Sequence, residues 1–254
     1  MKKNVLLKTA FLLINTLILH AGFDADSVFD IANRSYKNEH YIEAVQLYEE
    51  ILNQGYESAD LYFNLGNAYY KLTNYPKAIL QYEKALLHDP RNENIRFNLT
   101  KAQIYIVDQI DEIPEFVIKK WWNTAVAWFH SDIWAILSVL SFIAGITGIL
   151  LFFLTTKISI RRTGFYFGIV LILFSILSFS MASKSRSMLK NSNEAIVMTP
   201  TVTIKGSPSS TSTDLFIIHE GTKVFILEEF DEWFEIKLSD GKQGWLLKSD
   251  IEPI

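Results

Sequence analysis

The pattern of apolar and polar positions divides the chain into three parts. Up to about residue 107 the apolar residues follow a helical period, which indicates packed amphipathic helices. Two runs without charged residues follow, Ile133 to Leu154 and Gly164 to Ala182. From Glu194 onward apolar and polar residues alternate, which indicates short strands. We therefore expect a helical part, two long apolar helices and a small all-β part.

The helical part contains an internal repeat with a period of 34 residues. The paired positions are Phe29/Phe63, Asn33/Asn67, Tyr36/Tyr70, Ala44/Ala78, Tyr48/Tyr82 and Leu52/Leu86. Within the second copy, the motif is Tyr62-x2-Leu65-Gly66-x2-Tyr69, then Ala78-x3-Tyr82, then Pro90. This spacing resembles the tetratricopeptide repeat, which implies stacked antiparallel helix pairs that serve as a binding scaffold.

The resemblance places a tetratricopeptide domain at residues 23–112. Gly66 and Ala32 are small enough for the two helices of each pair to approach closely. A further helix from Asn92 to about Val107 keeps Phe97 in the 34-residue register but has no second half. We expect this helix to close the stack.

The family's groove-lining positions fall on aromatic and amide residues. They are Phe29, Asn33, Tyr36, Phe63, Asn67, Tyr70 and Phe97. Such a groove suits an extended or helical peptide with apolar anchors. The alternative is that the phenylalanines only pack one repeat against the next.

Some tetratricopeptide domains clamp the terminal carboxylate of a partner, and part of that clamp is present. Asn33 and Asn64 match its asparagines. Phe29, Asn94 and Asn98 stand at its basic positions, so we expect no fixed cation facing an acidic terminus.

The two apolar runs are each long enough to cross a hydrocarbon layer of about 30 Å at about 1.5 Å per residue. They predict a transmembrane hairpin at residues 132–183, with spans 133–154 and 164–182; two buried core helices are the alternative. Each run carries small residues, namely Ser138, Ser141, Gly145 and Gly148 in the first, and Gly164, Gly168, Ser175 and Ser178 in the second. These small residues pack the hairpin on itself or against another protein's helix. Neither run contains a charge, which argues against transport or proton relay.

Residues 1–22 have the basic start, apolar stretch and small final residues of a secretory signal, or of an uncleaved anchor. Lys157, Arg161 and Arg162 lie in a nine-residue connection, Thr155 to Thr163, which the positive-inside rule places in the cytoplasm. The repeat domain and the C-terminal part then both lie on the outer side.

Residues 113–131 link the repeats to the first span and are rich in aromatic side chains. Trp121, Trp122, Trp128 and Phe129 lie in or beside this segment, and Trp134 follows just inside the span. Such side chains settle at the headgroup level of a bilayer. The segment is either an interfacial helix or the aromatic girdle of the first span.

A polar, basic linker is expected at residues 184–193, and residues 194–254 then predict a small barrel. The expected strands are Glu194–Met198, Thr201–Lys205, Leu215–Ile218, Lys223–Glu229, Trp233–Leu238 and Gln243–Leu247. Asp240-Gly241 predicts a tight hairpin between the last two strands.

The segment Glu232-Trp233-Phe234, Asp240-Gly241 and Gly244-Trp245 resembles the bacterial Src-homology-three family. The resemblance implies an outward ligand face, here Trp233, Glu235 and Lys237. Trp233 contacts a ligand there, or it covers the loop from Gly206 to Thr213. Where eukaryotic relatives have a proline and a tyrosine, this chain has Leu247, Asp250 and Ile251, which argues against polyproline binding.

Composition narrows the function further. The chain has no cysteine, which excludes disulfides and thiolate chemistry, and its formal charge of −4 argues against nucleic-acid binding. Its five histidines show no paired metal-ligand spacing, and the sequence has no phosphate-binding glycine loop. His130-Ser131-Asp132 are adjacent, so they cannot converge as a catalytic triad. We expect a protein without enzymatic activity or a cofactor.

The order of these parts resembles the tetratricopeptide member of the Bat aerotolerance family, the BatE-like proteins. This resemblance implies a multi-domain protein of the bacterial inner membrane that works with von Willebrand-type membrane proteins in envelope or oxidative stress. It also implies a MoxR-type ATPase, reached indirectly because the cytoplasmic turn is short. The expected function is a periplasmic scaffold for protein partners. The alternative is a cell-wall sensor whose barrel binds peptidoglycan peptides.

Overall fold

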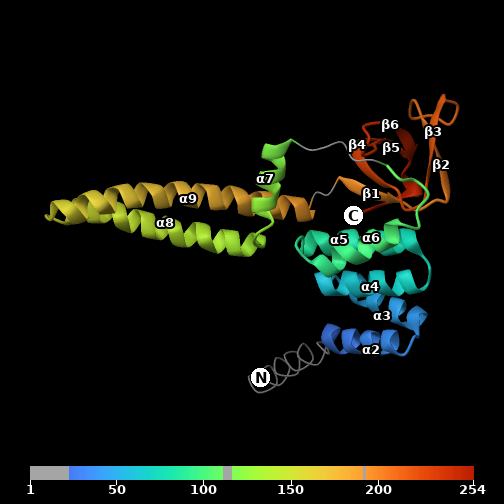
Figure 1. Ribbon diagram of the computed structural model, residues 1–254, viewed down its shortest axis with the longest axis horizontal. Helices are drawn as coiled ribbons and strands as arrows, with labels where there is room; N and C mark the ends of the chain where they lie inside the picture. Colours follow the sequence, from blue (N-terminus) through green and yellow to red (C-terminus); the bar gives the residue numbers. More distant parts are fainter. Residues whose placement is uncertain (1–22, 111–115, 191–192) are drawn as a thin grey trace, which may run out of the picture.

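The computed structural model describes residues 23–110, 116–190 and 193–254 (Figure 1). The predicted signal segment and residues 111–115, which include the start of the predicted aromatic segment, lie outside the described residues. The helical repeats comprise α2 (Ala25–Lys37), α3 (Tyr41–Asn53), α4 (Ala59–Lys71), α5 (Tyr75–His88) and α6 (Glu93–Gln103). These are the two helix pairs and the closing helix that the 34-residue period predicts. The closing helix ends at Gln103, before the predicted end near Val107.

Local sequence signals explain where these helices begin. The side chains of Asp24, Ser58 and Asn74 accept a hydrogen bond from a backbone N–H in the first turn of α2, α4 and α5. Glu39 and Thr73, 34 residues apart, have φ angles of 65° and 59° in the turns inside the two helix pairs. The turns, like the helices, therefore repeat.

Two long helices, α8 (Ser131–Leu154) and α9 (Ile158–Lys190), run antiparallel as a hairpin (Figure 1). Both are long and apolar enough to cross a bilayer. The connection between them is Thr155–Lys157, so the expected nine-residue turn was wrong. Arg161 and Arg162 lie in the first turns of α9, because nothing before Gly164 interrupts helix formation there.

The small residues of the two helices meet each other inside the hairpin. A Cβ added at Gly148 would lie 2.8 Å from the carbonyl oxygen of Gly164, and one at Gly168 would lie 2.8 Å from that of Gly145. The Ser138 hydroxyl donates to a backbone carbonyl of α9 at 3.0 Å. Of the two alternatives, packing of the hairpin on itself is therefore the one observed.

The flexible linker predicted at residues 184–193 is largely helical, because α9 continues to Lys190. No proline or glycine occurs between Gly168 and Lys190 to end the helix earlier. At about 1.5 Å per residue, α9 is about 50 Å long, well beyond the roughly 30 Å of a hydrocarbon layer. Its last turns therefore form a helical stalk towards the C-terminal sheet.

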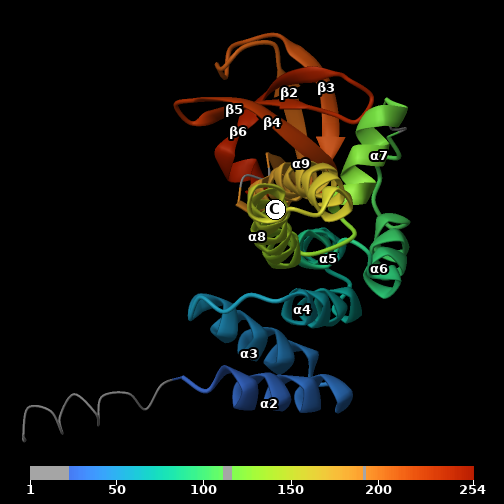
Figure 2. The same cartoon turned by 90° about the vertical axis from the view of Figure 1, so that its left-hand side faces the viewer.

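Helix α7 (Val117–Val126) crosses the base of the hairpin at a steep angle (Figures 1 and 2). The Trp121 and Trp128 side chains are 73% and 56% exposed. Trp134 is only 6% exposed, and its indole N–H donates to the carbonyl of Val126 at 3.0 Å. This side chain therefore packs inside the protein and joins α7 to α8.

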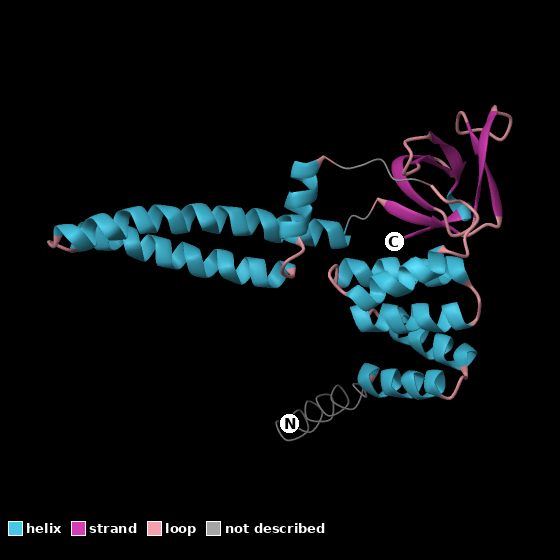
Figure 3. Ribbon diagram, in the orientation of Figure 1, coloured by secondary structure: helices cyan, strands magenta, loops and turns pink. Residues whose placement is uncertain are grey.

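The C-terminal part is an antiparallel sheet of seven strands among the described residues (Figure 3). The strands are β1 (Glu194–Val197), β2 (Thr201–Lys205), β3 (Asp214–His219), β4 (Lys223–Phe230), β5 (Trp233–Lys237), β6 (Gln243–Leu247) and β7 (Ile251–Pro253), in the order β3-β2-β6-β5-β4-β1-β7. Six match the predicted strands to within a residue or so, and β7 was not predicted. The tight hairpin at Asp240-Gly241 is confirmed, with φ of 92° at Gly241.

The sheet docks on the repeats, at the end of the stack opposite α2 (Figure 2). Ile196 of β1 is fully buried in the same apolar cluster as the repeat core, and Met198 and Ile254 pack against that cluster. Ile106, which follows α6, packs there as well. The repeats and the sheet thus share a core, although the hairpin separates them in sequence.

Polar contacts reinforce this interface. The Asp108 carboxylate accepts hydrogen bonds from the His219 backbone N–H at 2.6 Å and the Thr222 hydroxyl at 2.8 Å, and it lies 3.0 Å from the His219 ring. Burial opposes ionisation of Asp108, but these hydrogen bonds outweigh it and hold its pKa below the usual value.

A second polar contact centres on Lys223 of β4. Its ammonium group lies 3.0 Å from Glu83 of α5 and 2.8 Å from Glu194 of β1. Burial alone would lower the pKa of Lys223, but the two carboxylates outweigh that effect and raise it.

Candidate functional site

A repeating hydrogen-bond ladder joins the first helices of successive repeats. The side-chain oxygen of Asn33 accepts from the Tyr48 hydroxyl at 2.6 Å and from the Asn64 amide at 3.0 Å. One period later, the oxygen of Asn67 accepts from Tyr82 at 2.8 Å and from Asn98 at 2.8 Å. Each rung ties a helix to its own pair and to the next repeat.

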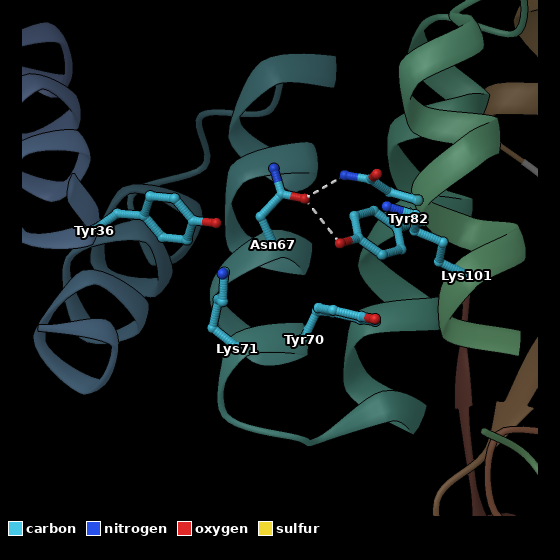
Figure 4. Close-up of a pocket in the computed structure, with 7 residues that line it drawn as sticks. Tyr36, Asn67, Tyr70, Lys71, Tyr82 and Lys101 are labelled. Carbon is cyan, nitrogen blue, oxygen red and sulfur yellow. Dashed lines mark hydrogen bonds between the residues drawn. The ribbon is translucent and has the colours of Figure 1, made fainter. Parts of the chain in front are cut away.

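A pocket of about 200 Å³ opens at the second rung (Figure 4). It is lined by Tyr36, Asn67, Tyr70, Lys71, Tyr82, Asn98 and Lys101. Helix α2 contributes Tyr36, and the other lining residues come from α4, α5 and α6. The 34-residue period brings them together, because equivalent positions of successive first helices face the same side of the stack.

Comparison with known proteins identifies one of these repeats. Residues 59–92 match the family model of the tetratricopeptide repeat. The chain contains a tetratricopeptide repeat. It is also similar to the crystal structure of YrrB, described as a tetratricopeptide protein with an unusual peptide-binding site, at 16% identity and a TM-score of 0.32. That match covers 73% of this chain and 86% of YrrB. No curated protein matches the chain.

The tetratricopeptide pocket is lined by two lysine ammonium groups, which only donate hydrogen bonds, and by tyrosine hydroxyls and amides, which can also accept them. The Asn67 oxygen already accepts two hydrogen bonds, and its amide nitrogen points away from both donors (Figure 4). Burial raises the pKa of Tyr36 and of Tyr82, so both hydroxyls stay protonated at neutral pH. A hydrogen bond with Tyr105 is the main cause that raises the pKa of Tyr70.

The structure divides the predicted groove residues into three groups. Tyr36, Asn67 and Tyr70 line the pocket. Asn33 forms the first rung of the ladder. The phenylalanines lie elsewhere.

Phe29 and Phe63 are half-buried, and their ring centroids lie 5.9 and 6.0 Å from those of Tyr48 and Tyr82. They contribute to the packing within each repeat and do not line the pocket. Phe97 is 61% exposed on α6.

Two lysines in the pocket were missed by sequence reasoning. The clamp positions for which no cation was expected are Phe29, Asn94 and Asn98, whereas Lys71 and Lys101 line the pocket from other positions. The comparison with the carboxylate clamp considered only the positions at which other tetratricopeptide domains carry basic residues, and neither lysine stands at one of them. The internal register gives a better signal, since Lys101 stands 34 residues after Asn67, at the position that asparagine occupies in the earlier repeats.

The predicted ligand face of the sheet lies on β5. Trp233 is half-buried and lies opposite Phe230 on β4 and Leu247 on β6, which are 57% and 39% exposed. Directly opposite residues of neighbouring strands share a face of the sheet, so these three apolar side chains form one patch. Glu235 lies opposite Trp245, and Lys237 lies opposite Gln243, on the same face.

Proposed function

We propose that the protein is a membrane-anchored, non-enzymatic scaffold that binds a peptide segment of a partner protein in its tetratricopeptide pocket. The observation that carries the proposal is the pocket itself, which is lined by polar side chains from four helices of the stack. The ladder of Asn67, Tyr82 and Asn98 fixes those helices relative to one another. A pre-organised site of this kind binds without first ordering its own side chains.

The exposed surface of the hairpin supports membrane anchoring. Only 17% and 28% of the apolar windows of α8 and α9 are buried within the protein. An apolar surface of that extent is unfavourable in water and favourable in lipid. The repeats are stacked along a direction roughly perpendicular to the long axis of α8 and α9 (Figure 1). With the hairpin across a bilayer, the stack would therefore lie along the bilayer surface, on the side of α7.

Direct contact between repeats and sheet supports their placement on one side of the membrane. Lys223 of the sheet lies 3.0 Å from Glu83 of the repeats, which requires a shared compartment. The signal-like N-terminus and the basic turn favour the periplasm of the inner membrane. Reporter fusions at Gln109 and after Ile254 should both be active only as exported reporters; cytosolic activity of either would contradict this topology.

The order of the parts supports a Bat-type assembly in envelope or oxidative stress tolerance, with von Willebrand-type membrane proteins as partners. The connection Thr155–Lys157 offers far less than the roughly 800 Å² per partner of a standard interface. A MoxR-type ATPase would therefore be reached through those membrane proteins.

Co-purification from native membranes tests the scaffold proposal. The variant Tyr36→Ala/Tyr70→Ala removes two pocket walls, and we expect it to lose partners that the unaltered protein retains. Tyr56→Ala is the matched control, because Tyr56 is 49% exposed outside the pocket. Equal recovery of every partner by both variants would refute binding through this pocket.

The apolar patch of Phe230, Trp233 and Leu247 favours a second candidate function, in which the sheet binds peptidoglycan peptides. The intact protein should then sediment with purified cell-wall sacculi, and Trp233→Ala should reduce that sedimentation. Sedimentation that is unchanged in this variant would exclude the patch as the binding surface.

A further inference from the structure

A second cleft lies at the base of the hairpin, where the end of α5 approaches the first turn of α8 (Figure 1). We call it the hairpin cleft. The repeats contribute residues from the start of α4 and the end of α5, and the hairpin contributes the first turn of α8 and Ser185 of α9. Its volume of about 340 Å³ falls within the roughly 300–1,000 Å³ of sites that bind small ligands.

The hairpin cleft lies at the depth of lipid headgroups when the hairpin spans a bilayer. The apolar run of α8 begins at Ile133, and that of α9 ends at Ala182. Ser131 and Ser185, which both line the cleft, stand just beyond those ends. At about 1.5 Å per residue they lie about 3–5 Å outside the hydrocarbon layer, within the roughly 5–8 Å of the headgroup layer. Headgroups therefore reach the cleft directly from the bilayer.

The charge of the cleft is negative. Among the described residues, Glu57 and Asp132 line it together with His88 and His130, and no lysine or arginine does. In the same parts of the chain, neither carboxylate forms an ion pair with a lysine or arginine. His88 lies 3.8 Å from Glu57, but burial lowers the pKa of this histidine, so its ring is neutral at pH 7. The cleft therefore favours a ligand that carries a positive charge.

The repeats hold Glu57 in place before any ligand binds. The Tyr62 hydroxyl forms a hydrogen bond with the Glu57 carboxylate, and Tyr62 itself is only 7% exposed. The Tyr62 ring also packs beside His88, with 5.5 Å between the ring centroids. A carboxylate that is already oriented loses little freedom when it accepts a hydrogen bond from a ligand.

Hydroxyl groups add hydrogen-bond donors to the same cleft. The Ser58 oxygen accepts the Leu61 backbone N–H at 3.1 Å, which leaves the hydroxyl hydrogen able to donate. Ser185 brings a second hydroxyl from α9. The hairpin cleft thus combines carboxylates for a cation with hydroxyls for an anion. A zwitterion that carries both charges matches this combination.

We propose that the hairpin cleft binds the headgroup of an aminophospholipid, phosphatidylethanolamine, with its ammonium group at Glu57 and Asp132 and its phosphate at the serine hydroxyls. A primary ammonium group donates three hydrogen bonds, which carboxylates accept. The described residues contain no group of three or more side chains that could hold a metal ion, so the carboxylates suit an ammonium better than a metal.

The rest of the lipid fits the surface next to the cleft. Ile133 and Ile136 of α8 are 45% and 58% exposed and offer an apolar surface for the acyl chains. A lipid bound there contacts both the repeats and the hairpin, so it holds the stack against the bilayer. The inference rests on the proposed membrane anchoring and specifies the lipid that takes part in it.

Lipid retention by the full chain, measured by native mass spectrometry, tests this proposal. The detergent-solubilised protein is incubated with equal amounts of dioleoyl phosphatidylethanolamine, phosphatidylcholine and phosphatidylglycerol, which differ only in the headgroup. We expect phosphatidylethanolamine to be retained about tenfold more than either of the others. Phosphatidylcholine has a cation without an N–H donor, and phosphatidylglycerol has no cation.

Substitution of the carboxylates separates headgroup recognition from general adhesion of lipid. Glu57→Gln/Asp132→Asn should reduce retention of phosphatidylethanolamine about tenfold and leave that of the other two lipids unchanged. The matched control Asp26→Asn/Glu93→Gln removes the same charge from exposed first-turn positions of α2 and α6 outside the cleft and should retain lipid normally.

A charge-reversed variant guards against loss of binding through misfolding. Glu57→Lys/Asp132→Lys should change the preference from phosphatidylethanolamine to phosphatidylglycerol, and unfolding does not produce such a gain. Equal helix content of all variants, measured by circular dichroism, is the accompanying check.

The outcomes distinguish this inference from the function on which it rests. Equal retention of the three lipids, or a preference for phosphatidylethanolamine that persists in Glu57→Gln/Asp132→Asn, overturns the aminophospholipid proposal and leaves membrane anchoring intact. An unaltered protein that stays soluble without detergent and does not enter lipid nanodiscs contradicts both.

Discussion

The contact at Gly66 gives a sharp test of how the repeats hold the pocket in shape. An alanine methyl there would lie 2.7 Å from Cδ1 and Cε1 of the Tyr82 ring and 3.3 Å from the Ala78 carbonyl oxygen. Favourable carbon contacts are about 3.5–4.0 Å, so the ring must move by about 1 Å. Tyr82 is only 1% exposed, and its hydroxyl donates to Asn67 in the pocket.

The expected cost follows from these two contacts. Overpacking costs about 1–3 kcal/mol, and loss of the Tyr82 hydrogen bond adds about 0.5–1.5 kcal/mol. We therefore expect Gly66→Ala to destabilise α4 and α5 by about 1.5–4.5 kcal/mol. Amide hydrogen exchange of those helices in the full chain should accelerate about 10- to 2,000-fold.

A matched control and a relief variant make this reasoning refutable. Gly206→Ala should change nothing, because its nearest neighbours would lie 3.6–3.7 Å from the new methyl group. In the background Tyr82→Leu the ring is gone, so the additional cost of Gly66→Ala should shrink. Exchange rates of α4 and α5 within about threefold of the unaltered protein, or strict additivity of the two changes, would refute the proposed clash.

Further predictions concern the hairpin and the interface between repeats and sheet. A cysteine pair at Ser138 and Ser175, whose hydroxyl oxygens are 3.2 Å apart, should oxidise to a disulfide, and Gly168→Val should slow that oxidation by separating the helices. Asp108→Asn should loosen the sheet from the repeats by about 1.5–3 kcal/mol, measured as faster proteolysis between them. Because the pKa of Asp108 is lowered by folding, its contribution is present above the unfolded value near 3.9 and is lost as pH falls through the folded value. Proteolysis of the unaltered protein by an acid-active protease should therefore rise below about pH 4, and that of Asp108→Asn should show a smaller rise.

Features that repeat or alternate locally could be predicted from the sequence. The 34-residue period predicts the helix pairs and the equivalence of Asn67 and Asn33, because both follow from residues that recur 34 positions apart. Alternation predicts six strands, and the residue pair Asp240-Gly241 predicts the hairpin between β5 and β6. The length of α9 was underestimated because the polarity of its last turns was taken for flexibility, although no helix breaker is present there.

Contacts between distant segments could not be predicted in this way. Asp108 and His219 are 111 residues apart, and no local pattern links them. Burial of Ile196 against the repeats likewise depends on the position of the end of α9, from which the chain continues into β1 beside the repeats. The two pocket lysines are an intermediate case, because the position of Lys101 in the repeat register is visible in the sequence, whereas its approach to Phe97 is a matter of three-dimensional packing.

The central claim, that a partner protein binds in the tetratricopeptide pocket, is tested most directly by photo-crosslinking in native membranes. A photoreactive amino acid placed at Tyr36 lies in the pocket wall, and the same group at Tyr56 lies exposed outside it. We predict that the probe at Tyr36 crosslinks to one segment of one partner protein and that the probe at Tyr56 does not. Identical products from both positions, or no product from Tyr36, would contradict the claim.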